Sequence, residues 1–194
     1  MNRYRILLFL LAVLVPTSLI ATPINLSIGS GTVANGGTIT IPIDISGVTD
    51  LFAFQFDLSF PALNLQALSV SEGPFLSSSG ATFFIPGFID NSAGSITFIA
   101  NTLIGLSTGA SGSGSLAFVD FQAIASGIAL LDMSNVVLLD SNLADISSTQ
   151  TSGTVQINNV PEPGTIWLLA MGLPAVLWFK RRRSRVSFTT DHDL

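Results

Sequence analysis

The chain has 194 residues, 48% of them hydrophobic, a formal net charge of −5 at pH 7 and no cysteine, which excludes disulfide bonds, thiol catalysis and thiolate metal sites. All seven Lys and Arg residues lie within residues 1–5 or 180–185, so residues 22–164 contain no basic side chain. Nucleic-acid binding by this middle part is excluded, because it requires cationic groups against the phosphates.

The first predicted element is an export signal. Two arginines within residues 1–5 precede a wholly apolar run, Ile6–Val15, and small and polar residues follow. This is the three-part plan of a secretory signal peptide, whose apolar region is too short to span a membrane. We predict a signal peptide over residues 1–21. An uncut signal anchor is the alternative, because Leu19 stands where a small residue is preferred.

Residues 22–158 are predicted to form one all-β domain. Apolar residues recur there with a period of two, which is typical of strands and not of helices. The runs with this pattern are Ile24–Ile28, Thr38–Ile45, Leu51–Ser59, Leu63–Val70, Thr82–Ile89, Ser95–Asn101, Ser115–Ala125, Ile128–Leu139 and Thr154–Ile157. Nine short strands separated by turns favour a β-sandwich.

Clusters of Gly, Pro, Asn and Ser predict the turns of this domain. They are Asn35-Gly36-Gly37, Gly73-Pro74, Asn91–Gly94, Gly109–Gly114 and Ser152-Gly153. Pro86 lies inside the fifth run, and a proline cannot donate to a central ladder, so this strand is predicted to lie at an edge or to contain a bulge.

Two stretches of the domain carry a recognisable pattern. The first is IPIDISGVTDLFAFQFDLSFPALNLQALSVSEG, from Ile41 to Gly73, with the corner Phe60-Pro61; the second opens with GSGSL, from Gly112 to Leu116. They are similar to the cohesin domain of cellulosome scaffoldins, in which a strand ends at a Tyr-Asp-Pro-like corner and a later strand opens with Gly-x-Gly-x-Leu. The resemblance implies a nine-stranded jelly-roll β-sandwich, of the form shared with carbohydrate-binding modules, and a binding role. It names no contacting residue.

The domain is predicted to be purely acidic. Of the twelve Asp and Glu residues, all but the last two lie in residues 22–164. We expect this surface to attract cations or a basic partner. We also expect mutual repulsion to raise carboxylate pKa values, so that acidification stabilises the fold. Asp132, Asp140 and Asp145 are candidate calcium ligands, because carboxylates are hard oxygen donors; isolated turn aspartates are the alternative.

Catalysis is not expected. Residues 22–164 contain no His, Cys, Lys, Arg or Tyr, and so lack the usual general bases and activated nucleophiles. A glycosidase needs only two carboxylates, for which Asp57 with Asp120, or Asp132 with Asp140, are the candidate pairs. Acidic residues in strands and turns are more commonly solvated surface groups.

Sugar binding is a further alternative. Sugar-binding platforms rely on exposed aromatic rings, and the domain has neither Tyr nor Trp. Its phenylalanines fall mostly on alternating apolar faces, as core residues do. Phe83, Phe84 and Phe88 break the alternation around Pro86, and we expect one of these rings to be exposed.

The C-terminal region reads VPEPGTIWLLAMGLPAVLWFKRRR and joins three elements. A rigid spacer, in which no helix can begin, is followed by an apolar run over residues 165–179, predicted to be a transmembrane helix, and by a cationic cluster that stays in the cytoplasm with a tail over residues 186–194. The spacer residues are Pro161, Glu162 and Pro163, and the cluster is Lys180, Arg181, Arg182 and Arg183. At about 1.5 Å per residue the run spans only about 22 Å, so the anchor is marginal.

This order of elements, over residues 159–185, resembles the PEP-CTERM sorting signal of Gram-negative bacteria. The resemblance implies export, temporary retention in the inner membrane with the sandwich outside, and processing near the Pro-Glu-Pro motif by an exosortase-type enzyme. The mature form is then expected at the cell surface or outside the cell. An ordinary anchor that is never cut is the alternative.

The sequence therefore predicts a non-catalytic, exported module that binds a surface or matrix protein. The alternative is a polysaccharide-binding protein of the exopolysaccharide or biofilm layer. No cofactor is expected, apart from calcium at the candidate aspartates.

Overall fold

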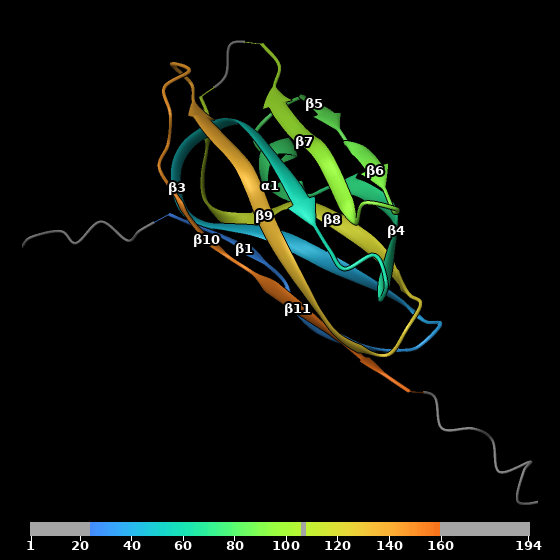
Figure 1. Ribbon diagram of the computed structural model, residues 1–194. Helices are drawn as coiled ribbons and strands as arrows, with labels where there is room; N and C mark the ends of the chain where they lie inside the picture. The colour runs from blue at the N-terminus through green and yellow to red at the C-terminus, as the bar shows by residue number, and fades with distance from the viewer. Residues whose placement is uncertain (1–23, 106–107, 160–194) are drawn as a thin grey trace, which may run out of the picture.

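The computed structural model describes residues 24–105 and 108–159 (Figure 1). These residues form eleven strands and one short helix: β1 Asn25–Ile28, β2 Gly31–Ala34, β3 Thr38–Ser59, β4 Leu65–Glu72, α1 Pro74–Ser77, β5 Thr82–Ile85, β6 Phe88–Asp90, β7 Ser95–Leu103, β8 Ala110–Ala123, β9 Gly127–Asp140, β10 Thr149–Thr151 and β11 Gly153–Asn158. The predicted all-β class is confirmed. In the described part of the chain, no helix has the length and apolar character needed to cross a membrane.

The long strand β3 connects the two layers of the fold. Its first half pairs with β1 and β8, and its second half pairs with β7 and β9. The register against β8 shifts three times between Ile43 and Leu51, and Gly47 and Asp50 take positive φ values of 72° and 60°. These irregularities bend the strand, so that it leaves one layer and enters the other (Figure 1).

The strand pairings define the two layers. The first layer runs β4–β8–β3–β1–β10, through the first half of β3. The second layer runs β2–β11–β9–β3–β7, through the second half of β3, with β5 and β6 both paired to the far side of β7. The β-sandwich predicted from the short alternating runs is therefore confirmed.

The core lies between the layers and follows the alternation of β3. Ile41, Ile43 and Ile45 are buried from one half of the strand, and Phe54 and Phe56 from the other, as their common faces predict. The two phenylalanine rings stack with their centroids 5.8 Å apart. Away from the bulges every second residue of β3 points inward, so the residues between them form the outer surfaces of the two layers.

The predicted count of nine strands is wrong. The first and second halves of β3 form one continuous strand, because bulges absorb the polar residues between them. The run around Pro86 is divided into β5 and β6, each paired only with β7, which agrees with the predicted edge position. The strands β2 and β10 have only four and three residues, which is too short to show an apolar alternation.

Two predicted turns are also corrected. Gly73-Pro74 opens the helix α1, in which the proline occupies the first turn, where its missing N–H leaves no hydrogen bond unmade. The stretch Gly109–Gly114 enters strand β8 at Ala110, since Gly112 pairs opposite Val48 at one of the bulges of β3. The turns at Asn35-Gly36-Gly37 and Asn91–Gly94 are confirmed.

Candidate functional site

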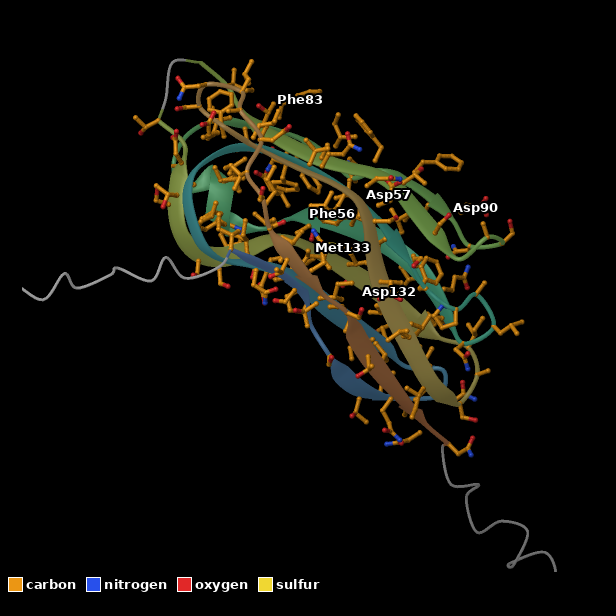
Figure 2. The ribbon with its side chains drawn as sticks, turned by 60° about the vertical axis from the view of Figure 1, so that its left-hand side comes forward. Phe56, Asp57, Phe83, Asp90, Asp132 and Met133 are labelled. Atoms are coloured by element: carbon orange, nitrogen blue, oxygen red, sulfur yellow. The ribbon has the colours of Figure 1, made fainter. Side chains whose placement is uncertain are left out.

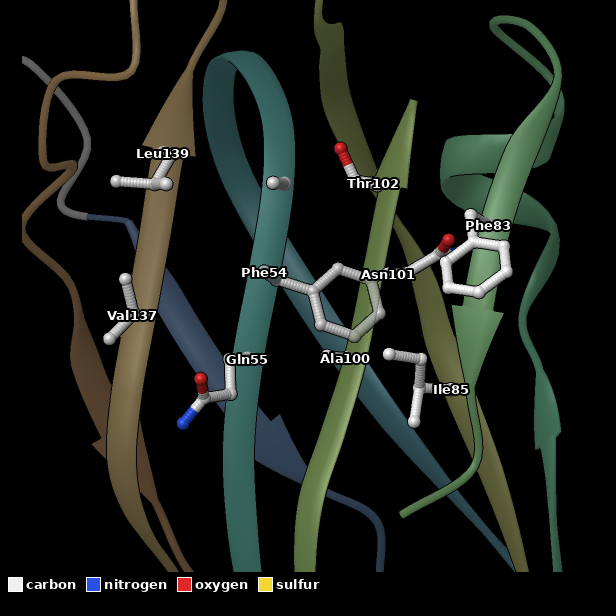
Figure 3. A pocket seen from close by; sticks show the side chains of 10 residues that line it. Phe54, Gln55, Phe83, Ile85, Ala100, Asn101, Thr102, Val137 and Leu139 are labelled. Atoms are coloured by element: carbon white, nitrogen blue, oxygen red, sulfur yellow. The ribbon is translucent and has the colours of Figure 1, made fainter. Parts of the chain in front are cut away.

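The outward surface of the second layer is apolar where four strands lie side by side in the order β9, β3, β7 and β5 (Figure 3). We call this surface the outer face. Two rows of paired residues cross it: Leu139, Ala53, Thr102 and Phe83 form one, and Val137, Gln55, Ala100 and Ile85 form the other. Six of these eight side chains are apolar, on a surface that alternation turns toward water.

The outward surface of the first layer is polar and provides the contrast. Thr40 Oγ1 donates to Asp120 Oδ1 at 2.5 Å, and Ser69 Oγ donates to Asp120 Oδ2 at 2.7 Å. Farther along β3, Ser115 Oγ donates to Asp44 Oδ1 at 2.5 Å. This is the ordinary arrangement of an antiparallel sheet with one wet face. The apolar character of the outer face therefore requires a functional explanation.

The outer face is hollowed along its centre. The small residues Ala53 and Ala100 belong to the lining on the two central strands. Larger side chains of β9 and β5 lie on either side of these strands (Figure 3). The hollow, which we call the outer groove, has a volume of about 210 Å³. Its walls lie three strand spacings apart, about 14 Å between backbones. An α-helix with its side chains is about 10–12 Å across, so a helix that lies over the hollow can place side chains in it.

Phe83 lines the outer groove, and two further exposed phenylalanines lie on the neighbouring strands β6 and β7. Phe83 on β5 is 60% exposed, Phe88 on β6 is 71% exposed and Phe98 on β7 is 49% exposed. The prediction of an exposed ring near Pro86 is thus confirmed for two of the three candidates, since Phe84 is partly buried against the core. Figure 2 shows Phe83 near one end of the second layer and Asp132 toward the other, with Asp57 between them.

Asp57 of β3 lies at a β-bulge against each of the two neighbouring strands, β7 and β9. The register of β3 shifts against β7 between Phe56 and Leu58, and against β9 beside Asp57. The Phe98 N–H donates to Asp57 Oδ1 at 2.7 Å, and Asn135 Nδ2 donates to Asp57 Oδ2 at 2.6 Å. Both donor residues have left-handed backbones, with φ of 61° at Phe98 and 51° at Asn135. Asparagine tolerates this conformation, whereas for a bulky phenylalanine it is an outlier.

The candidate calcium ligands do not converge. Asp132 lies near the middle of β9 and Asp140 at its end, pairing with Ser59 and Leu51, so about 27 Å of strand separates them. Asp140 Oδ1 accepts hydrogen bonds from the N–H groups of Asn142 and Ala144, as a turn cap does. Among the described residues, no group of three or more His, Cys, Asp or Glu side chains is placed to hold a metal ion.

Asp145, the third candidate, lies in the turn beyond β9, where its backbone bridges to Leu139. Asp132 accepts a hydrogen bond from the Ser152 hydroxyl. Each aspartate thus serves local structure, and the prediction that the three gather is wrong.

Asp57 and Asp120, one of the candidate catalytic pairs, also have structural roles. Both oxygens of Asp57 accept hydrogen bonds from its bulges, and both oxygens of Asp120 accept hydroxyl hydrogen bonds. Hydrogen bonds from two hydroxyls lower the pKa of Asp120, and the one from Thr40 has a larger effect than the one from Ser69. A glycosidase acid requires a raised pKa, so this environment opposes that role.

The predicted signals at the two ends of the chain lie outside the described residues. These are the signal peptide over residues 1–21, the Pro161, Glu162 and Pro163 motif, the helix over 165–179 and the Lys180 to Arg183 cluster.

Sequence reasoning missed the outer groove. Its only signal was the lack of polar residues at outward positions, as at Ala53, Ala100, Val137 and Leu139. Outward positions can be assigned only once the bulges are known, because each bulge reverses the alternation of the strand that carries it.

Two family models match the chain. A model described as the cohesin domain matches residues 24–157, and a model described as the PEP-CTERM protein-sorting motif matches residues 159–183. The first match covers the whole described fold apart from its last residues. The second covers the region in which the sequence predicts a sorting signal.

Individual proteins agree with the first match. Cellulose-binding protein A of Clostridium cellulovorans is 25% identical over 147 residues, which are 74% of this chain and 8% of that protein, so the chain spans a small part of its relative. A non-cellulosomal cohesin of Archaeoglobus fulgidus has a TM-score of 0.57 and 18% identity, over 71% of this chain and 92% of that one. The third cohesin of ScaC from Acetivibrio cellulolyticus, solved in complex with the ScaB dockerin, has a TM-score of 0.58 and 14% identity, over 69% of this chain and 98% of that one.

Proposed function

The chain belongs to the cohesin family, and from this premise we propose that it is a non-catalytic exported module that holds a protein partner in its outer groove. Cohesin domains are protein-interaction modules, and the sorting motif is that of exported proteins. The groove is the observation that carries the proposal, because it is an apolar hollow that the described sheet leaves open to solvent. A dockerin-type partner is supported by the solved complexes of similar folds.

The chemistry of the groove defines the partner further. Its apolar walls and exposed phenylalanines require an apolar ridge on the partner, which is the usual source of interface affinity. The domain as a whole is acidic, since residues 22–164 carry ten carboxylates and no Lys, Arg or His to neutralise them. We infer that basic side chains flank the apolar ridge of the partner, since charge complementarity steers association.

The sorting motif supports a location outside the cell for this module. We propose that the signal peptide over residues 1–21 starts export, that residues 165–179 hold the precursor in the inner membrane, and that an exosortase-type enzyme cuts near Pro161, Glu162 and Pro163. The cluster Lys180, Arg181, Arg182 and Arg183 would then remain in the cytoplasm with residues 186–194. Released in this way, the groove faces the cell surface or the surrounding matrix.

A second candidate function is glycan binding. It is favoured by the exposed rings of Phe83, Phe88 and Phe98, since sugars stack on aromatic faces, and a similar protein carries the name cellulose-binding. The two candidates differ in what the outer face retains. Exopolysaccharide and secreted protein from the same culture can therefore be tested side by side.

Capture from the secreted fraction tests the proposal. The full chain, immobilised in mild detergent, is exposed to the secreted proteins of its own organism and, separately, to the exopolysaccharide. We expect a protein to be retained by the wild type and lost with Val137→Asp or Phe83→Asp. The matched control is Leu68→Asp, since Leu68 is a half-exposed apolar residue of the first layer. Equal retention by Val137→Asp and Leu68→Asp would refute the groove, and retention of glycan alone would favour the second candidate.

A further inference from the structure

The backbone of β7 is strained at Phe98. A φ of 61° brings the Cβ of an L-residue close to its own backbone, and phenylalanine gains nothing locally that offsets this. Such outliers are energetically unfavourable and persist only where the surroundings hold them. Phe98 is half exposed and precedes Ala100, a residue of the outer groove, by two positions on β7, so its conformation sets where an exposed ring stands.

The group that holds this conformation is the Asp57 carboxylate. At the bulge, the Phe98 N–H has left the ladder of β3, and Asp57 Oδ1 accepts it at 2.7 Å. The other oxygen accepts a hydrogen bond of 2.6 Å from Nδ2 of Asn135, which lies on β9, the neighbour of β3 on its other side. One side chain thus fixes a left-handed residue on each side of β3. Hydrogen bonds to a carboxylate are stronger than those between neutral groups, which suits this task.

We propose that Asp57 is the positioning residue of the outer face, which acts through Phe98 and Asn135 and not through its charge on a partner. This inference rests on the proposed function, because it concerns the same surface. Asp57 fixes the Phe98 ring and the Asn135 amide before a partner arrives, and a pre-organised surface loses less conformational entropy on binding. The two bulges are therefore part of the binding surface and not irregularities of the sheet.

The test compares Asp57→Ala with Asp57→Asn in the full chain, labelled for NMR in detergent micelles. Asparagine keeps an oxygen for the Phe98 N–H, and the Asn135 amide can turn to accept from the new Nδ2, so the geometry survives without the charge. Asp132→Ala is the control, since it removes one carboxylate from the same layer without touching Phe98. The readouts are the HN–Hα coupling of Phe98, which reports φ, the exchange rate of its amide, and capture of secreted protein.

With Asp57→Ala, we expect the Phe98 coupling to move to that of an extended strand, its amide exchange to accelerate about tenfold or more, and capture to fall about tenfold. Asp57→Asn and Asp132→Ala should keep the coupling, the exchange rate and most of the capture. An unchanged coupling and exchange rate in Asp57→Ala would overturn the proposal. Capture lost equally in Asp57→Asn and Asp57→Ala would overturn it too, because the charge would then be the important property.

A second variant keeps the proposal testable if Asp57→Ala does not fold. Phe98→Gly accepts a φ of 61° without strain, so the carboxylate is no longer needed to hold β7. Adding Asp57→Ala to Phe98→Gly should leave the amide signals of Thr97 and Ile99 in place; a large shift there would contradict the proposal. These NMR readouts need no partner. They therefore decide on Asp57 even if Val137→Asp shows that the proposed function is wrong.

Discussion

The carboxylate of Asp50 accepts a hydrogen bond of 2.7 Å from the backbone N–H of Gly109, which joins the bend of β3 to the entrance of β8. Its other oxygen accepts a hydrogen bond of 2.6 Å from the hydroxyl of Ser141, which lies just beyond the end of β9. These hydrogen bonds lower the pKa of Asp50, and the one from the Ser141 hydroxyl has a larger effect than the one from the Gly109 N–H. One aspartate at the bend thus ties β3, which both layers share, to β8 of the first layer and to the end of β9 in the second.

This relationship predicts that acid destabilises the fold. The Ser92 hydroxyl and the Ala93 N–H lower the pKa of Asp90, and hydroxyl groups lower that of Asp120. A carboxylate whose folded pKa is lowered contributes stability above its unfolded pKa, about 4, and this is lost as the pH falls through the folded pKa. Thermal melts of the full chain should therefore show a constant Tm from about pH 7 to 5 and a falling Tm below about pH 4.

The control is Asp50→Asn, which should lower Tm at pH 7 and reduce its fall in acid. A Tm that rises on acidification would instead support the repulsion expected from composition. That expectation is wrong for Asp50, Asp90 and Asp120, because the sequence shows charges but not the serine, threonine and backbone donors that folding brings to them.

Any side chain at Gly73 is predicted to destabilise the fold. A Cβ at this position would overlap the backbone carbonyl of Ser115 and lie 2.7 Å from the carbonyl carbon of Leu116, and backbone cannot move aside cheaply. Gly73→Ala should lower the free energy of unfolding by about 1–3 kcal/mol or more. At Gly31 the closest atom is the flexible end of Ile39, so Gly31→Ala should cost less. Denaturant unfolding of both variants checks this; equal losses would contradict it.

Much of the fold can be predicted from local patterns. The alternation of Ile41, Ile43 and Ile45 is visible in the sequence because one face of β3 is buried and the other is wet. The division of the fifth run follows from the ring of Pro86. In contrast, β2 and β10 depend on pairing with distant strands and carry no pattern of their own.

The site could not be predicted in the same way. Asp57 reads as a solvated strand residue, and its role requires bulges on two strands that lie about 40 and 80 residues farther along the chain. Phe98 reads as a core residue by alternation, and only its positive φ turns it outward. The groove likewise arises from residues of four strands that become neighbours on folding.

Truncation of a buried phenylalanine should lower the stability of the fold, whereas truncation of an exposed one should lower partner capture. Phe56 is fully buried, so Phe56→Ala should cost about 3–5 kcal/mol of unfolding free energy through lost burial and a cavity. Phe83 is 60% exposed, so Phe83→Ala should change stability by less than about 0.5 kcal/mol while it reduces partner capture. Denaturant melts and capture on the same two variants test this. A stability loss at Phe83 as large as that at Phe56 would show that Phe83 belongs to the core.

The sorting motif predicts the C-terminus of the released protein. We expect intact-mass measurement on protein shed from cells to find a chain that ends near Pro161–Pro163. Replacing Glu162 by Ala should leave the precursor in the membrane fraction. Released protein that still carries Leu194 would show that no cut takes place there.

Photo-crosslinking in living cells tests the outer groove most directly, because the partner need not be identified in advance. A benzophenone amino acid replaces Phe83 on the outer face or, as the control, Leu68 on the first layer. On irradiation, the chain with the probe at residue 83 should form a discrete, protein-sized adduct that Val137→Asp abolishes, and the chain with the probe at residue 68 should form none. Adducts from residue 68 alone, or equal adducts from both positions, would contradict the assignment of partner binding to the groove.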